Sequence, residues 1–158
     1  MGARAAFYWL AAALVPFVWW LRGRHQPYPH LVDALVVAPF LVDVGGNALD
    51  LYDRIVGFDD FAHLVNWAFL VSAFGAVMVS LLIGRLNAAC LALGFGAVTH
   101  ILWEIVEWVA QEAGTSGLNL TYDDTIGDLA LSLTGSFIGS VVTATFLWRR
   151  RGLARALV

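Results

Sequence analysis

The chain has 158 residues, of which 60% are hydrophobic and only 13% are charged, and its mean hydropathy is +0.76. A soluble domain of this length needs a far more polar surface, so the composition excludes that class and is typical of a polytopic helical membrane protein. The chain has no lysine and no compact basic face, which argues against a nucleic acid as partner. The only cysteine, Cys90, lies in an apolar run, which excludes an intrachain disulfide, and we expect it to be a small buried residue.

Five hydrophobic segments are each near the roughly 20 residues that cross about 30 Å of hydrocarbon. No linker or low-complexity stretch separates them, so the sequence predicts a single integral membrane domain over residues 1–158. The predicted fold class is all-α, a polytopic membrane bundle of about five transmembrane helices. The expected spans are residues 5–21, 31–51, 61–83, 87–110 and 125–148.

The first of these segments shares one feature with a secretory signal peptide, because Arg4 precedes its apolar stretch. However, the segment contains Pro16 and three tryptophans, and it is followed by Arg22-Gly23-Arg24 rather than by a small-residue cleavage site. We therefore expect it to be a retained transmembrane helix.

The arginines are divided unevenly between the two sides of the predicted bundle. Cytoplasmic loops of membrane proteins are enriched in arginine and lysine, so the arginine-rich side is expected inside. This places the N-terminus outside and the C-terminus in the cytoplasm, with eleven of the twelve carboxylates toward the extracytoplasmic side. The seven arginines on the cytoplasmic side are Arg22, Arg24, Arg85, Arg149, Arg150, Arg151 and Arg155.

Polar residues recur at helical spacing in the outer halves of four of these spans. Residues four or seven apart lie on one face of a helix, and a charge facing lipid costs a few kcal/mol, so each stripe must face the interior or a water-filled cavity. The stripes are Asp43, Asn47 and Asp50; Asp59 and His63; His100, Glu104 and Glu107; and Asp124 and Asp128.

So many carboxylates at one depth repel one another unless protons or a bound cation neutralise them. We favour a divalent metal ion, held by Asp59, His63, His100, Glu104, Asp124 and Asp128. Because two inward histidines accompany the carboxylates, Zn, Mn or Fe is favoured over Mg or Ca.

Simpler interpretations exist for several of these residues. His63 alone is typical of an interfacial hydrogen-bonding residue, and Glu107 could lie at the interface beside Trp108. Asp123 and Asp124 could cap the N-terminus of the last helix, where negative charge is favoured. Small residues on that helix, such as Ser132 and Ser136, favour packing within the chain, and a homodimer seam is the less favoured use.

Three short motifs in residues 50–140 resemble a group of small, largely uncharacterised bacterial inner-membrane proteins distantly similar to the VanZ-like proteins of glycopeptide-antibiotic resistance. The motifs are Phe58-Asp59-Asp60-Phe61-Ala62-His63, Glu104-Ile105-Val106-Glu107-Trp108 and Asp124-Thr125-Ile126-Gly127-Asp128. Where that group has a basic residue after the first aspartate, this chain has Asp60, which makes the site more acidic. The resemblance implies a multi-pass protein of the bacterial plasma membrane with a shared helical bundle.

If the expected metal is catalytic, the favoured reaction is hydrolysis of a lipid or lipid-linked substrate at the interface, with Glu107 as general base. Two alternatives from other classes stay open: a proton or cation transport component, and a non-enzymatic subunit of a membrane assembly. The expected partners are membrane lipids, a lipid-linked substrate and a second copy of the chain.

Overall fold

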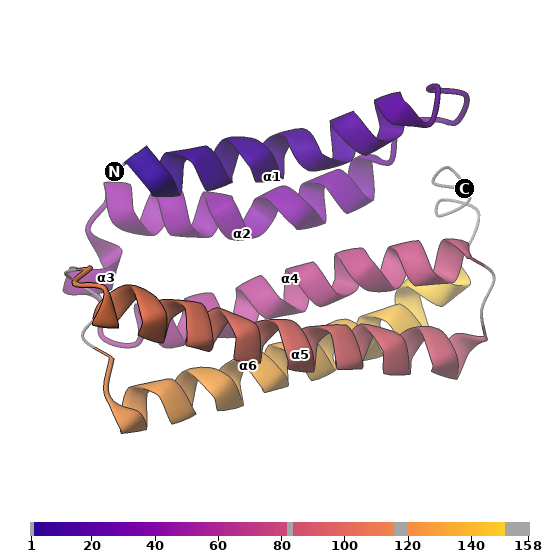
Figure 1. Ribbon diagram of the computed structural model, residues 1–158. Coiled ribbons are helices and arrows are strands. Elements are labelled where there is room, and N and C mark those ends of the chain that lie inside the picture. Colours follow the sequence, from indigo (N-terminus) through magenta and orange to yellow (C-terminus); the bar gives the residue numbers. More distant parts are fainter. Residues whose placement is uncertain (1, 82–83, 116–119, 151–158) are drawn as a thin grey trace.

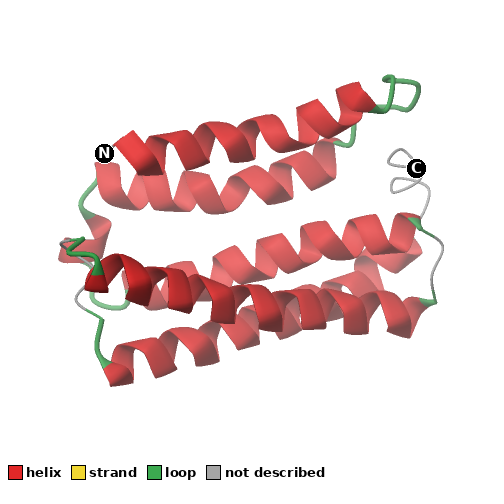
Figure 2. Cartoon of the chain, viewed as in Figure 1, coloured by secondary structure: helices red, strands yellow, loops and turns green. Residues whose placement is uncertain are grey.

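The computed structural model describes residues 2–81, 84–115 and 120–150, and every regular element within them is helical (Figure 2). The helices are α1 (Gly2–Leu21), α2 (His30–Ala48), α3 (Leu51–Arg54), α4 (Phe58–Ser80), α5 (Arg85–Glu112) and α6 (Tyr122–Val142), and α6 continues into a π-helical segment, η1 (Thr143–Leu147). Within these residues four helices are long and apolar enough to cross a membrane, namely α2, α4, α5 and α6 with η1. They confirm the second to fifth expected spans. The first expected span coincides with α1, whose described apolar part is Ala12–Leu21.

Successive long helices run in opposite directions, so their connections gather at the two ends of the bundle (Figure 1). These two ends differ chemically. The connections from α2 to α4 and from α5 to α6 lie at the end that carries Asp50, Asp59 and Asp123, which we call the acidic end. The connections from α1 to α2 and from α4 to α5 lie at the other end with Arg22 and Arg85, which we call the arginine end. The expected separation of carboxylates from arginines is therefore present in the fold.

α4 is the central helix and contacts α2, α5, α6 and η1. Its most extensive contact is with α6, because two glycines of α6 leave room for the α4 backbone. A Cβ atom at Gly135 would overlap the carbonyl oxygen of Leu64, and one at Gly139 would lie 2.9 Å from the carbonyl oxygen of Ala68. Small residues permit such close approach of helix backbones within a membrane.

The small residues of α6 also face α5. A Cβ atom at Gly96 would overlap Ser136, and the hydroxyl of Ser140 donates a hydrogen bond of 2.9 Å to the carbonyl oxygen of Ala89. Ser132 is fully buried beside them. The small-residue stripe is therefore used for packing within one chain, and a homo-oligomer, which stays a prediction, would need another surface.

The interior of the bundle changes character along its length. Toward the arginine end it is an apolar cluster contributed by α1, α2, α4, α5 and η1. Toward the acidic end the buried side chains include His100, Glu104 and Asp128. The apolar cluster consists of Val15, Val32, Ala76, Val79, Ala88 and Leu147.

Cys90 differs from its expected position. It is exposed rather than buried, because the inward face of α5 is formed by residues at four-residue spacing that begin at Ala88 and continue through Ala92 and Gly96. Cys90 lies two residues after Ala88 and therefore points away from that face.

The contact at Gly135 predicts a stability effect. Gly135→Ala is expected to lower the free energy of unfolding by about 1–3 kcal/mol, because the new methyl group meets backbone atoms that cannot move aside. Thermal unfolding in detergent measures this. Gly127→Ala on the same helix is the control, since its Cβ would meet nothing within 4 Å. Equal melting temperatures for the two variants would refute the close contact.

The orientation of the bundle is testable with single cysteines in a Cys90→Ala background. Val56→Cys lies at the acidic end and Gln26→Cys at the arginine end, and both native side chains are exposed. If the arginine end is cytoplasmic, a membrane-impermeant maleimide added outside intact cells should label only Val56→Cys. Labelling of Gln26→Cys alone would reverse the predicted orientation.

Candidate metal centre

Three helices bring the expected site residues into the acidic half of the bundle. On α5, His100 and Glu104 continue the inward face of that helix, and both are buried. On α6, Asp128 stands one turn before Ser132 on the buried face. On α4, His63 lies one turn after Asp59 and faces the other two helices, since its ring approaches side chains from both.

His63 is the centre of this arrangement. Its Nε2 atom lies 3.6 Å from Oδ1 of Asp128 and 3.9 Å from Oδ1 of Asp59. Its Nδ1 atom lies 3.1 Å from the hydroxyl oxygen of Ser132 and 3.8 Å from Oε1 of Glu104. One imidazole therefore has neighbouring oxygens on both of its nitrogen edges.

The carboxylate oxygens stand too far from the ring nitrogens for hydrogen bonds, which require about 2.7–3.2 Å. Their distances from the ring nitrogens are close to the distance between two ligand atoms of one ion. Bonds of about 2.0–2.2 Å at tetrahedral angles place neighbouring ligand atoms about 3.4 Å apart. Asp59, His63 and Asp128 each offer a ligand atom, and the three atoms lie within 4.8 Å of one another.

A second group, His63, Glu104 and Glu107, likewise has one potential ligand atom from each residue within 4.8 Å of the others. The two groups share His63, and the Glu104 oxygen of the second group lies 3.8 Å from Nδ1, whereas Asp59 and Asp128 of the first lie near Nε2. The Nδ1 edge already has Ser132 at hydrogen-bonding distance, which leaves Nε2 as the nitrogen that faces carboxylates alone.

Glu104 and Asp128 are deeply buried for acidic residues, with exposed fractions of 5% and 3%. Neither oxygen of Glu104 has a hydrogen-bond partner among the described residues. Within the same residues, the ion pairs of Glu104 and Asp128 are both made with His63. One imidazole cannot neutralise several carboxylates, and a buried charge without compensation is costly. Bound protons or a cation must therefore neutralise the remaining negative charge.

Not every expected ligand joins these sets. His100 lies one turn deeper on α5, where its ring packs edge-on against Trp67 with 5.9 Å between ring centroids, and neither of its nitrogens has a hydrogen-bond partner among the described residues. Asp124 is exposed in the first turn of α6. Glu107, expected as a base rather than a ligand, belongs to the second set.

The alternative that Asp123 and Asp124 cap α6 is wrong. The cap is Thr121, whose hydroxyl accepts a hydrogen bond of 3.2 Å from the backbone N–H of Asp124. The two aspartates follow in the first turn, where negative charge is favoured by the helix dipole.

The hydrogen-bonding position of Ser132 beside His63 was not predicted from the sequence, where its small side chain indicates helix packing only. The signal was present, because Ser132 follows Asp128 at the spacing that joins Asp124 to Asp128. Asn66, three residues after His63 on α4, was not predicted either, and its Oδ1 atom is buried without a hydrogen-bond partner among the described residues.

The fold and this cluster define an integral membrane protein of helical class with a carboxylate–histidine group in its interior. The chain belongs to the family described as Predicted membrane protein (DUF2238), whose model matches residues 3–150. No curated protein and no solved structure matches the chain. The expected class of membrane protein is thus confirmed, while these comparisons give no support to a similarity with VanZ-like proteins.

The environment of His100 generates a prediction. Replacing a buried polar group that lacks a partner by an apolar group of similar shape is nearly neutral or stabilising. His100→Phe should therefore leave the melting temperature in detergent unchanged or higher, and it should leave metal content unchanged. A large loss of stability, or of bound metal, would instead show that His100 is a ligand, as expected from sequence.

Proposed function

We propose that this protein binds one divalent transition-metal ion through Asp59, Nε2 of His63 and Asp128. The observation that carries the proposal is the position of His63, whose Nε2 atom faces two carboxylate oxygens at ligand-to-ligand separations and not at hydrogen-bonding distance. With the arginine end in the cytoplasm, the ion lies in the extracytoplasmic half of the bundle.

Ser132 supports this assignment. A metal-bound histidine usually donates its other ring N–H to a neighbouring acceptor, which fixes the tautomer and the ring orientation. With Nε2 on the ion, Nδ1 carries the proton and can donate to Ser132, 3.1 Å away. The donor set of one imidazole and two carboxylates favours Zn, Mn or Fe over Mg and Ca.

We further propose that the ion serves hydrolysis of a lipid or lipid-linked substrate. A metal with three protein ligands keeps a position open and lowers the pKa of a water bound there. Glu107, half-buried in the neighbouring group, would act as general base toward such a water and would return the proton to the leaving group. Asp128 is buried whereas the Asp59 side chain is 55% exposed, so water would reach the proposed centre from the acidic end.

The transport alternative would need polar groups that connect the cluster with the arginine end. Buried hydroxyls do follow α6 in that direction, but those of Ser136 and Thr143 donate to backbone carbonyl oxygens of their own helix, and that of Ser140 donates to Ala89. Their protons are thus engaged with the backbone, which favours a one-sided site over a relay.

Elemental analysis of the purified, chelator-free protein tests whether a metal ion is bound. We expect about one equivalent of a transition metal in the native protein and at least a tenfold lower content in Asp128→Asn. Asp60→Asn is the matched control, because Asp60 is exposed beside Asp59 and belongs to neither ligand set.

A folded native protein without metal would refute the proposal and shift the interpretation to protonated carboxylates. Proteoliposome flux abolished by Asp128→Asn would then support transport. A partner that co-purifies in fixed ratio would support a subunit of an assembly.

A further inference from the structure

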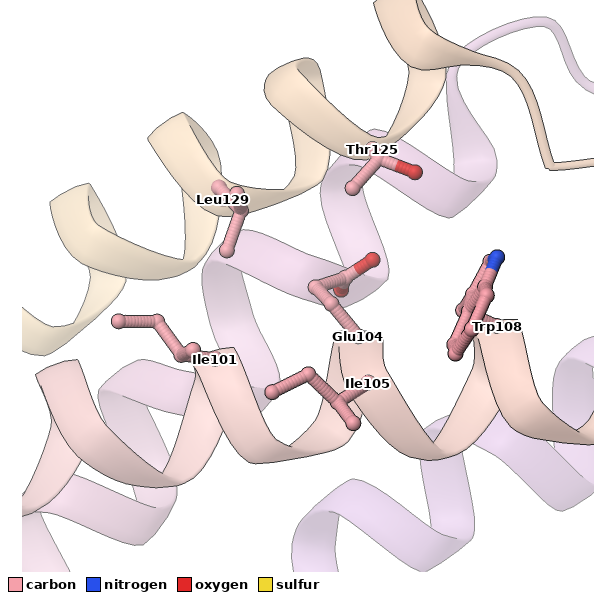
Figure 3. Close-up of a pocket in the computed structure, with 6 residues that line it drawn as sticks. All are labelled: Ile101, Glu104, Ile105, Trp108, Thr125 and Leu129. Carbon is pink, nitrogen blue, oxygen red and sulfur yellow. The ribbon is translucent and has the colours of Figure 1, made fainter.

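A shallow groove of about 260 Å³ lies between α5 and α6, with Glu104 among its apolar walls (Figure 3). Sites that enclose a whole small molecule measure roughly 300–1,000 Å³, so this groove accommodates only part of a ligand. The lining residues are Ile101, Glu104, Ile105, Trp108, Thr125 and Leu129.

The groove opens on the lipid-facing side of the bundle. Ile101, Ile105 and Trp108 are about half exposed, on a helix long and apolar enough to cross a membrane. Side chains exposed there contact hydrocarbon, and a tryptophan near the end of a span lies at the level of the lipid head groups. Trp108 lies on the acidic-end side of Glu104, and Ile101 lies deeper.

Glu104 gives the groove a polar feature that packing alone does not explain. The residue is 95% buried by its neighbours, its oxygens have no hydrogen-bond partner among the described residues, and the nearest ring nitrogen of His63 is 3.8 Å away. A buried acceptor in this state lacks a donor. The groove is the side from which a donor can come.

The charge around Glu104 selects the kind of donor. Glu107 and Asp128 stand with it near His63, and among the described side chains of the acidic end the one arginine is Arg54, exposed on α3. A primary ammonium group provides both a positive charge and three N–H donors. A phosphate or a sugar hydroxyl lacks the positive charge.

We infer that the groove is the access route by which a lipid with a primary ammonium group reaches Glu104 from the outer leaflet. The acyl chain lies along Ile101 and Leu129, and the ammonium group donates to the Glu104 carboxylate beside the ring of Trp108, which also attracts cations. This inference rests on the proposed function in one respect, because it names the substrate class of the same site.

Native mass spectrometry of the detergent-purified protein tests the inference with three phospholipids that share identical acyl chains. Phosphatidylethanolamine has the primary ammonium group, phosphatidylcholine has a positive charge without an N–H, and phosphatidylglycerol has neither. We expect phosphatidylethanolamine to bind at least tenfold more tightly than the other two. Equal affinity for the three lipids would overturn the inference.

Variants locate the binding. Ile105→Trp and Ile101→Trp fill the groove from half-exposed positions, and Glu104→Gln removes its charge, so each should weaken phosphatidylethanolamine binding at least tenfold. Val106→Trp is the control, since Val106 is exposed on the same helix and does not line the groove. Unchanged binding in both groove-filling variants would overturn the inference, as would equally strong binding of soluble phosphoethanolamine.

Metal content measured in the same samples separates the two proposals. A native protein that prefers phosphatidylethanolamine but holds no metal refutes the proposed metal site and supports the inference. A native protein that holds metal but shows no lipid preference refutes the inference alone.

Discussion

The contact between α4 and α6 at Gly135 determines where the candidate site forms. The α6 backbone lies directly against the carbonyl oxygen of Leu64, the residue after His63, and this contact fixes the position of α6 along α4. Asp128 and Ser132 precede Gly135 on the inward face of α6, so they come to lie beside the two nitrogens of the His63 ring. Packing of small residues in one part of the helix pair therefore positions polar residues in another.

The two halves of the bundle differ in the chemistry of their buried side chains. Near the arginine end, apolar side chains from four helices and η1 fill the interior, and Asp33, the one acidic side chain among the residues described at that end, accepts a hydrogen bond of 2.7 Å from Tyr28. Burial, with a further contribution from Asp33, raises the pKa of Tyr28 to about 12, so this donor keeps its proton. Near the acidic end, Glu104 and Asp128 share one imidazole. That imbalance of charge makes the acidic half the functional candidate.

Sequence periodicity predicted much of this arrangement. Hydrophobic runs located four spans, and the i, i+4 spacing of Asp59 and His63 placed both residues on one face of α4, in a group that could hold a metal ion. Periodicity predicts which face of a helix is buried, but not which residue of a neighbouring helix each side chain meets. His100 and Glu104 lie one turn apart on the same buried face of α5, so the sequence could not show that they have different neighbours. Periodicity also did not predict that Cys90 is exposed, because an apolar residue in a span can face either lipid or protein. The partnership of His63 with Ser132 depends on the tertiary contact of two helices.

A ligand whose donors come from α4 and α6 binds the folded arrangement and not the separated helices. By mass action such a ligand stabilises the native state by RT ln(1 + [L]/Kd), about 2.7 kcal/mol at a free concentration of 100 Kd. The apolar cluster at the arginine end is independent of that term, whereas the acidic end is not. Under the proposed metal binding, the availability of the ion would set how firmly the acidic end of the bundle is closed, and chelation would loosen the helices from that end.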